Sequence, residues 1–247
     1  MATPFFSNSD LELAAAIHAS LVVPHSGDDR FEVTTHFHPS AGIGGDYTTV
    51  LARDSERVFA CISDVCGHGI AAALLATRVS SHVRSVIPRV EDPCQLASDL
   101  NAFLYEKFTS HLHNLFVTFF SVLVDFDRRS LTWAGFGHPP ALWLEPEATV
   151  PRRLCSANTF LGIGPHLVGE ACRMERVQLV AGGRLLLYTD GLLESKTPSG
   201  PFGFKKIESV FASSRPGKAP DDLAASADAL RNGDAEDDVT IVELTFR

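Results

Sequence analysis

Residues 58–72 read VFACISDVCGHGIAA, and this stretch determines how the rest of the chain is interpreted. It opens with five apolar residues at 58–62, which predict a strand covered on both faces, because a solvated face would bring in alternate polar residues. The run ends at Asp64, and the glycines at 67 and 69 lead into a helix with an apolar stripe. The stretch therefore predicts a buried strand, an acidic residue at its end and an amphipathic helix in direct succession.

The flanking segments continue this pattern of strands and helices. Their apolar residues predict further strands at 31–38, 46–51, 116–126, 131–136, 141–144, 173–179, 184–189 and 239–246. Helical spacing predicts helices at 10–21, 67–86, 205–212 and 221–230, and Asp92-Pro93 predicts the N-terminal cap of another. The turn at 127–130 joins two of the strands in a hairpin, which predicts antiparallel pairing.

The order of these elements points to one fold class. Strands and helices come in groups, which favours an α+β fold over alternating βαβ units. Several strands are apolar on both faces, so two packed sheets with amphipathic helices outside them satisfy the pattern. We divide the chain into an N-terminal helix and linker at 1–30 and a single domain at 31–247.

Composition excludes several classes of protein. The chain has 247 residues and a net charge of -9, which excludes a broad basic surface for nucleic acid. Phosphate chemistry stays open if bound cations supply positive charge. No apolar run approaches the roughly 20 residues of a membrane helix, and no signal peptide is visible. Five cysteines, an odd number without C-x-x-C spacing, predict reduced thiols and a soluble cytoplasmic protein without a membrane partner.

Four aspartates share one kind of position. Asp46, Asp64, Asp190 and Asp237 each lie at the end of a predicted strand or beside glycine. Strand ends bring distant residues together, and oxygen ligands without Cys or His suit hard ions such as Mg²⁺ or Mn²⁺. The alternative is that each is a turn residue, because Asp-Gly pairs are common in turns.

Seven motifs together give the chain a family resemblance. They are GGDY at 44–47, DVCGHGIAA at 64–72, FVTFF at 116–120, GHPPA at 137–141, LG at 161–162, YTDGLLE at 188–194 and DDVT at 237–240. In this order they resemble the PPM-type metal-dependent protein serine/threonine phosphatases, and most of all their bacterial SpoIIE-like and RsbU-like branch. The resemblance spans nearly the whole chain. It implies a β-sandwich of two antiparallel sheets flanked by helix pairs, with residues 31–247 as the phosphatase domain.

The resemblance also implies a centre of two Mn²⁺ or Mg²⁺ ions at one end of the sandwich. Asp46 would bridge the ions, Asp64 and the backbone carbonyl of Val65 would bind on one side, and Asp190 and Asp237 would bind on the other. A hydroxide shared by the ions would attack a phosphoserine or phosphothreonine phosphorus, with no protein nucleophile. Asp238 is expected to support these ligands rather than to bind an ion itself.

Other positions have open roles or depart from the family pattern. His68 would protonate the leaving serine oxygen or contact phosphate, and the alternative is that it only pins its turn. His138 is expected to shape the rim of the site. Thr49 stands where relatives place a further Asp, with Thr48 before it, so that position offers no carboxylate for an extra metal contact. No arginine directly precedes Gly44 as a phosphate clamp.

The branch suggests a partner and a pathway. The expected substrate is a phosphorylated signalling protein, with a STAS-type anti-sigma-factor antagonist suspected, and hence a role in sigma-factor regulation. The alternative function is a catalytically silent phosphoprotein-binding module of the same fold, and a third is a hydrolase of small phosphoesters. The stripe of the first helix, which includes Ile17 and Leu21, either packs on the core or pairs two chains in a homodimer.

Overall fold

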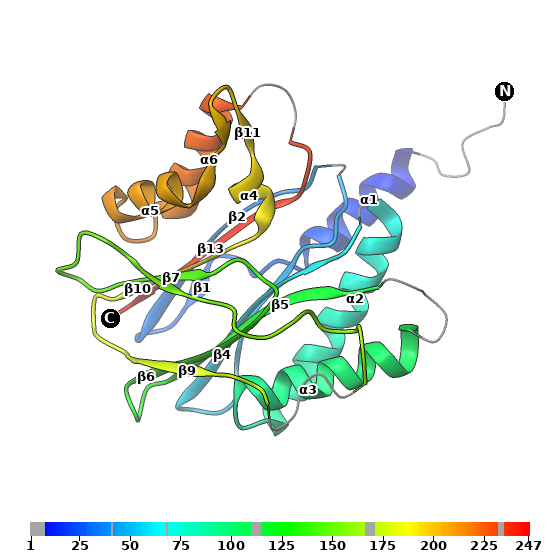
Figure 1. The fold of residues 1–247 in the computed structure, drawn as a ribbon, viewed down its shortest axis with the longest axis horizontal. Helices are drawn as coiled ribbons and strands as arrows, with labels where there is room; N and C mark the ends of the chain where they lie inside the picture. The colour runs from blue at the N-terminus through cyan, green and yellow to red at the C-terminus, as the bar shows by residue number, and fades with distance from the viewer. Residues whose placement is uncertain (1–7, 41, 68, 110–114, 166–170, 232–234) are drawn as a thin grey trace, which may run out of the picture.

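A computed structural model describes residues 8–40, 42–67, 69–109, 115–165, 171–231 and 235–247 (Figure 1). Its larger sheet has the strand order β1-β2-β13-β10-β7-β8, and every pair is antiparallel. These strands are β1 (Ser26–Gly27), β2 (Phe31–His38), β13 (Val239–Phe246), β10 (Arg184–Tyr188), β7 (Ala141–Leu144) and β8 (Arg152–Leu154).

The second sheet has the order β3-β4-β5-β6-β9, again with antiparallel pairs. Its strands are β3 (Tyr47–Ala52), β4 (Arg57–Val65), β5 (Val117–Asp125), β6 (Ser130–Phe136) and β9 (Glu175–Gln178). A separate two-stranded ribbon pairs β11 (Lys196–Thr197) with β12 (Gly200–Pro201). The predicted hairpin of β5 and β6 is confirmed, with Ser130 opposite Asp125.

Helices cover the outer face of each sheet. Figure 1 shows α5 (Gly203–Ser213) and α6 (Ala219–Leu230) on one side, and α2 (Gly69–Val86) and α3 (Pro93–Leu104) on the other. The remaining helices are α1 (Asn8–Ala19) and the short α4 (Asp190–Glu194), with a 3-10 turn at Ile87–Arg89 and a π turn at Tyr105–Thr109. The predicted cap of α3 is confirmed, because Asp92 accepts a hydrogen bond of 2.9 Å from the Gln95 amide.

Three apolar layers hold this arrangement together, and β4 shows why. Phe59 and Cys61 pack toward α2 and α3, whereas Ala60 and Ile62 pack against the other sheet. Side chains alternate between the two faces of a strand, so a strand at the centre of the sandwich has to be apolar at every position. The predicted α+β sandwich of two antiparallel sheets between helix pairs is therefore confirmed.

Some local features differ from the sequence-based expectations. Residues 190–194 form the short helix α4, and β8 lies within a segment that was given no strand. The prediction that all cysteines are reduced is wrong, because Cys94 and Cys172 form a disulfide. The fold brings their Cα atoms to 6.0 Å across a sequence separation of 78 residues, which spacing along the chain does not reveal.

The first helix is only partly seated on the core. Within α1, Leu13 and Ile17 are exposed and His18 is buried, whereas Leu21 and Val22, which follow the helix, pack on the core or are buried. Homodimerisation and the division at residue 30 stay predictions. Within the part of the chain that is described, no helix has the length and apolar character needed to span a bilayer.

Candidate metal centre

The four predicted aspartates reach one end of the sandwich from different segments. Asp46 lies just before β3, Asp64 lies near the end of β4, Asp190 begins α4 and Asp237 precedes β13. Burial, and then the charges of Asp190 and Asp237, raise the pKa of Asp64 to about 8. The pKa of Asp190 is also raised, by burial and by the charges of Asp237 and Glu194. These mutual effects mean that the carboxylates share one electrostatic environment.

Asp46 is the most enclosed of the four. It is 1% exposed, and burial followed by the charge of Asp64 raises its pKa well above the usual range. Its Oδ2 accepts hydrogen bonds from the hydroxyls of Thr189 at 2.8 Å and Thr240 at 2.6 Å. These two bonds favour the charged form and oppose the effect of burial.

The two glycines before Asp46 are explained by what lies against them. A Cβ on Gly44 would come within 1.4 Å of Asp238 Oδ2. A Cβ on Gly45 would come within 2.6 Å of the Val65 carbonyl oxygen. Only glycine allows such close approaches. The Gly-Gly-Asp motif thus places Asp46 directly beside the end of β4, where Val65 was predicted to contribute its carbonyl.

Asp238 holds the same loop through its carboxylate. Oδ2 accepts the Gly45 amide at 2.9 Å, and Oδ1 accepts the Ser40 amide at 2.9 Å and the Ser40 hydroxyl at 3.1 Å. Asp238 is buried, so these bonds are shielded from competing water. These contacts tie Asp238 to the loop that carries Asp46, and its supporting role behind metal ligands stays a prediction.

The N-terminal segment also contacts this loop, which the sequence had not indicated. The Gly44 amide donates to Nε2 of His18 on α1 at 3.3 Å. The Val23 amide donates to the Thr48 hydroxyl at 2.8 Å, and Arg84 of α2 donates to the Thr49 hydroxyl at 2.8 Å. The hydroxyls of both threonines are therefore engaged by protein groups.

Asp64 is supported from β5. Its amide donates to the Thr118 hydroxyl at 3.3 Å, and that hydroxyl lies 2.8 Å from Nδ1 of His138. His138 is buried rather than at the rim, and burial lowers its pKa to about 3. The imidazole is therefore neutral at physiological pH. His68 lies outside the described residues.

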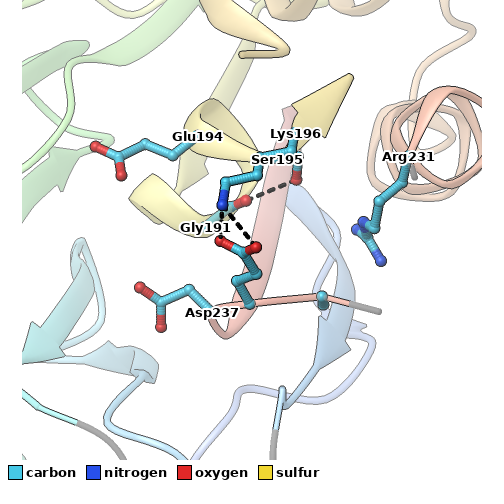
Figure 2. Close-up of a pocket in the computed structure, with 8 residues that line it drawn as sticks. Gly191, Glu194, Ser195, Lys196, Arg231 and Asp237 are labelled. Atoms are coloured by element: carbon cyan, nitrogen blue, oxygen red, sulfur yellow. Dashed lines mark hydrogen bonds and ion pairs between the residues drawn. The ribbon is translucent and has the colours of Figure 1, made fainter. Parts of the chain in front are cut away.

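A cavity of about 260 Å³ opens beside Asp237 (Figure 2). Lys196 and Arg231 face it from opposite sides, and Asp237 points the same way as Glu194. Both cations are already engaged: Lys196 lies 2.6 Å from Glu236, and Arg231 lies 3.1 Å from Asp228. The cavity therefore adds basic groups near the aspartates without a free phosphate clamp.

The donor chemistry of this end fits a hard divalent cation. The four aspartates and the Val65 carbonyl offer only oxygen atoms, which Mg²⁺ and Mn²⁺ prefer. Among the described residues, no three His, Cys, Asp or Glu side chains lie close enough to hold an ion as they stand. The carboxylates nevertheless raise one another's pKa values, so they lie near enough to repel each other, and a cation would offset that repulsion.

Comparison with known proteins finds a matching family model and relatives of the same family. Residues 54–247 match the family model described as Stage II sporulation protein E. The chain is 26% identical over 186 residues to the phosphoserine phosphatase RsbP of Bacillus subtilis, covering 75% of this chain and 45% of RsbP. It is 25% identical over 195 residues to the phosphoserine phosphatase RsbU of the same species, covering 78% and 56%. The chain thus spans about half the length of these relatives.

Solved structures show the same fold. The PP2C domain of SiaA from Pseudomonas aeruginosa superposes with a TM-score of 0.82 at 18% identity, covering 97% of this chain and 96% of that one. The PP2C domain of SpoIIE from Bacillus subtilis gives 0.75 at 18% identity, covering 89% and 64%. RsbX, solved in complex with magnesium, gives 0.66 at 15% identity, covering 91% and 99%. The family match begins after Asp46, whereas the SiaA superposition covers nearly the whole chain.

Proposed function

The chain belongs to the SpoIIE family, and on that premise we propose that it is a metal-dependent protein serine/threonine phosphatase. The observation that carries the proposal is the meeting of four aspartates from separate segments at one end of the sandwich. The raised pKa values of Asp46, Asp64 and Asp190, and the oxygen-only donor set, are expected of a site that is completed by cations.

In this proposal the ligands are the four aspartates and one carbonyl. Asp46, Asp64, Asp190, Asp237 and the Val65 carbonyl would hold two Mn²⁺ or Mg²⁺ ions. When bound, the ions would lower the pKa of a water, so that its deprotonated form can attack phosphorus, and would supply positive charge for the phosphoryl oxygens. Asp46 is shielded from bulk water because it is buried. Asp238 fixes the loop that carries Asp46, because it accepts a hydrogen bond from the Gly45 amide. His68 would donate a proton to the leaving serine or threonine oxygen.

The proposed substrate is a phosphoserine or phosphothreonine on a bacterial signalling protein. RsbP and RsbU are both named phosphoserine phosphatases, which supports phosphoserine as the reacting group. A STAS-type anti-sigma-factor antagonist is the specific partner we propose, with regulation of a sigma factor as the outcome. Such a partner would place the protein in the cytoplasm, where a persistent Cys94–Cys172 disulfide is uncommon.

Hydrolysis of a phosphoserine peptide tests the proposal. We expect turnover with Mn²⁺ or Mg²⁺, none with EDTA, and loss of most turnover in Asp190→Asn with the fold retained. Asp127→Asn changes an exposed aspartate in the β5–β6 turn and is the matched control. Full activity in Asp190→Asn would contradict the ligand assignment.

The same assay separates the two alternatives. A silent binding module would bind the phosphopeptide and hydrolyse nothing with either ion. A hydrolase of small phosphoesters would turn over free nucleotides faster than the peptide. The presence of all four aspartates favours the active phosphatase over the silent module.

A further inference from the structure

Two threonines from neighbouring strands converge on Asp46. Thr189 directly follows β10, and Thr240 is the second residue of β13. The Thr189 amide donates to the Thr240 carbonyl at 3.0 Å, and the Thr240 amide donates to the Thr189 hydroxyl at 3.0 Å. These bonds hold the two threonines together independently of Asp46. Asp46 itself lies in the segment that leads into β3 of the other sheet.

Both hydroxyls donate to the same carboxylate oxygen. Thr240 Oγ1 lies 2.6 Å and Thr189 Oγ1 lies 2.8 Å from Asp46 Oδ2. Thr189 Oγ1 also lies 3.3 Å from the Asp238 carbonyl, but it has a single hydrogen and the carboxylate is the nearer and stronger acceptor. A carboxylate oxygen offers two lone-pair sites, so these two donors occupy Oδ2.

The surroundings make this orientation hard to change. Thr189 and Thr240 are 0% exposed, and Asp46 is 1% exposed. Water therefore does not replace a lost hydroxyl. If the carboxylate turned, the buried Thr240 hydroxyl would lose its acceptor, and Thr189 would keep only the more distant Asp238 carbonyl. Oδ1 is left as the oxygen that can face the other aspartates.

We propose that Thr189 and Thr240 are positioning residues that hold Asp46 by Oδ2 and present Oδ1 to a divalent cation. The inference rests on the proposed function and sharpens it, because it identifies which oxygen of Asp46 would be available to a cation. Neither threonine touches substrate. Their effect is on the affinity of the site for the cation.

A purely structural role for the hydroxyls predicts something different. In that case Thr→Val would lower the stability of the protein without changing its affinity for Mn²⁺. The change from threonine to valine keeps the shape and removes the donor, whereas the change to serine keeps the donor and removes a methyl group. Together they separate hydrogen bonding from packing.

The test measures binding of Mn²⁺ alone to the full chain by calorimetry, without substrate. We expect Thr189→Val and Thr240→Val to weaken binding by about 10–100-fold, the usual effect of removing a group that orients a metal ligand. Thr189→Ser and Thr240→Ser should stay within about threefold of the wild type, because the donor remains. Thr34→Val is the matched control, since Thr34 is a buried threonine of β2 whose hydroxyl has no hydrogen-bond partner among the described residues.

Wild-type affinity in a folded Thr→Val variant at both positions would overturn the proposal. So would serine variants that bind as weakly as the valine variants, because packing would then be the cause. If Thr240→Val does not fold, the Mn²⁺ affinities of Thr189→Val, Thr189→Ser and Thr240→Ser still test the proposal. Wild-type protein that binds no Mn²⁺ also overturns it.

The outcomes keep this inference apart from the proposed phosphatase activity. If the valine variants lose affinity while the wild type hydrolyses no phosphopeptide, the positioning role stands and the proposed activity falls. If the wild type is an Mn²⁺-dependent phosphatase and the valine variants bind normally, the activity stands and the positioning role falls.

Discussion

The candidate site has two halves that are built differently. Asp46 is almost fully enclosed, its Oδ2 is held by two hydroxyls, and its loop is held by Asp238. Asp190 is partly exposed at the start of the five-residue helix α4, and Asp237 is exposed beside a cavity. One half is thus fixed by the packing of both sheets, and the other lies on short surface segments.

This difference shows how one site can hold a ligand in a fixed orientation and still be accessible to a protein substrate. An enclosed carboxylate is oriented before a ligand arrives, so little freedom is lost on binding. An exposed carboxylate has to be ordered at that moment, but it lies where a protein substrate can approach. We therefore expect the enclosed half to fix the position of a cation and the open half to meet the substrate.

Substitution in each half gives the largest expected difference. Asp46→Asn should lower kcat/KM by about 1,000-fold, because no water or side chain replaces a buried ligand. Asp237→Asn should lower it by about 100-fold or less, since solvent and nearby Glu194 can substitute. Steady-state kinetics on a phosphoserine peptide at saturating Mn²⁺ measures both. Equal losses would contradict the division into halves.

Addition of metal should stabilise the protein by relieving repulsion around Asp64. At a concentration 100 times Kd, Mn²⁺ adds about 2.7 kcal/mol, or roughly 5–10 °C in Tm for a domain of this size. Differential scanning fluorimetry against EDTA measures the shift. Asp46→Asn should abolish most of it, and an unchanged Tm in the wild type would count against a metal site.

Removal of the disulfide should affect stability without affecting the site. Cys94→Ser should lower the free energy of unfolding by about 2–4 kcal/mol, while turnover at 25 °C stays within about twofold. Cys155→Ser, which changes an exposed free thiol, is the control. Urea denaturation measures the effect, and thiol titration of protein extracted under native conditions shows whether the bond exists in the cell. A loss of turnover in the folded variant would tie the site to this bond.

The pH dependence of stability should have an unusual sign without metal. The pKa of Asp64 is about 8 in the fold and about 3.9 when unfolded, so between these values the folded state holds a proton that the unfolded state has lost. Stability in EDTA should therefore fall as pH rises from 5 to 9, by on the order of a few kcal/mol. Urea midpoints measure this slope, which Asp64→Asn should reduce. A midpoint that rises over this range would contradict the raised pKa.

How much was predictable from the sequence depends on the range of each interaction. The strand at 58–62 was identified because both faces of β4 are buried, so every position of the run is apolar. The positions of the four aspartates followed from strand ends and motifs, although their ligand roles stay a proposal. The helix α4 was missed because five residues are too few for a periodic pattern.

The contacts that were missed all join residues far apart in the chain. Thr189 and Thr240 appear beside candidate ligands in their motifs, but nothing in those motifs names Asp46 as their acceptor. Position 44 requires glycine because the carboxylate of Asp238, nearly 200 residues away in the chain, lies against it. Patterns of neighbouring residues do not reveal such a contact. The Cys94–Cys172 pair is hidden in the same way.

The pairing of β2 with β13 has a consequence for biosynthesis. β13 lies between β2 and β10 and carries Thr240, and Asp238 directly precedes it. While the ribosome is still making the helices that precede β13, the edge of β2 that pairs with β13 has no partner strand. The loop that carries Asp46 then also lacks the hydrogen bonds that Asp238 supplies. The second sheet and its helices can form before β13 is made, whereas the site is completed only after β13 has been synthesised. A nascent chain stalled before β13 should therefore carry a folded half and no working centre.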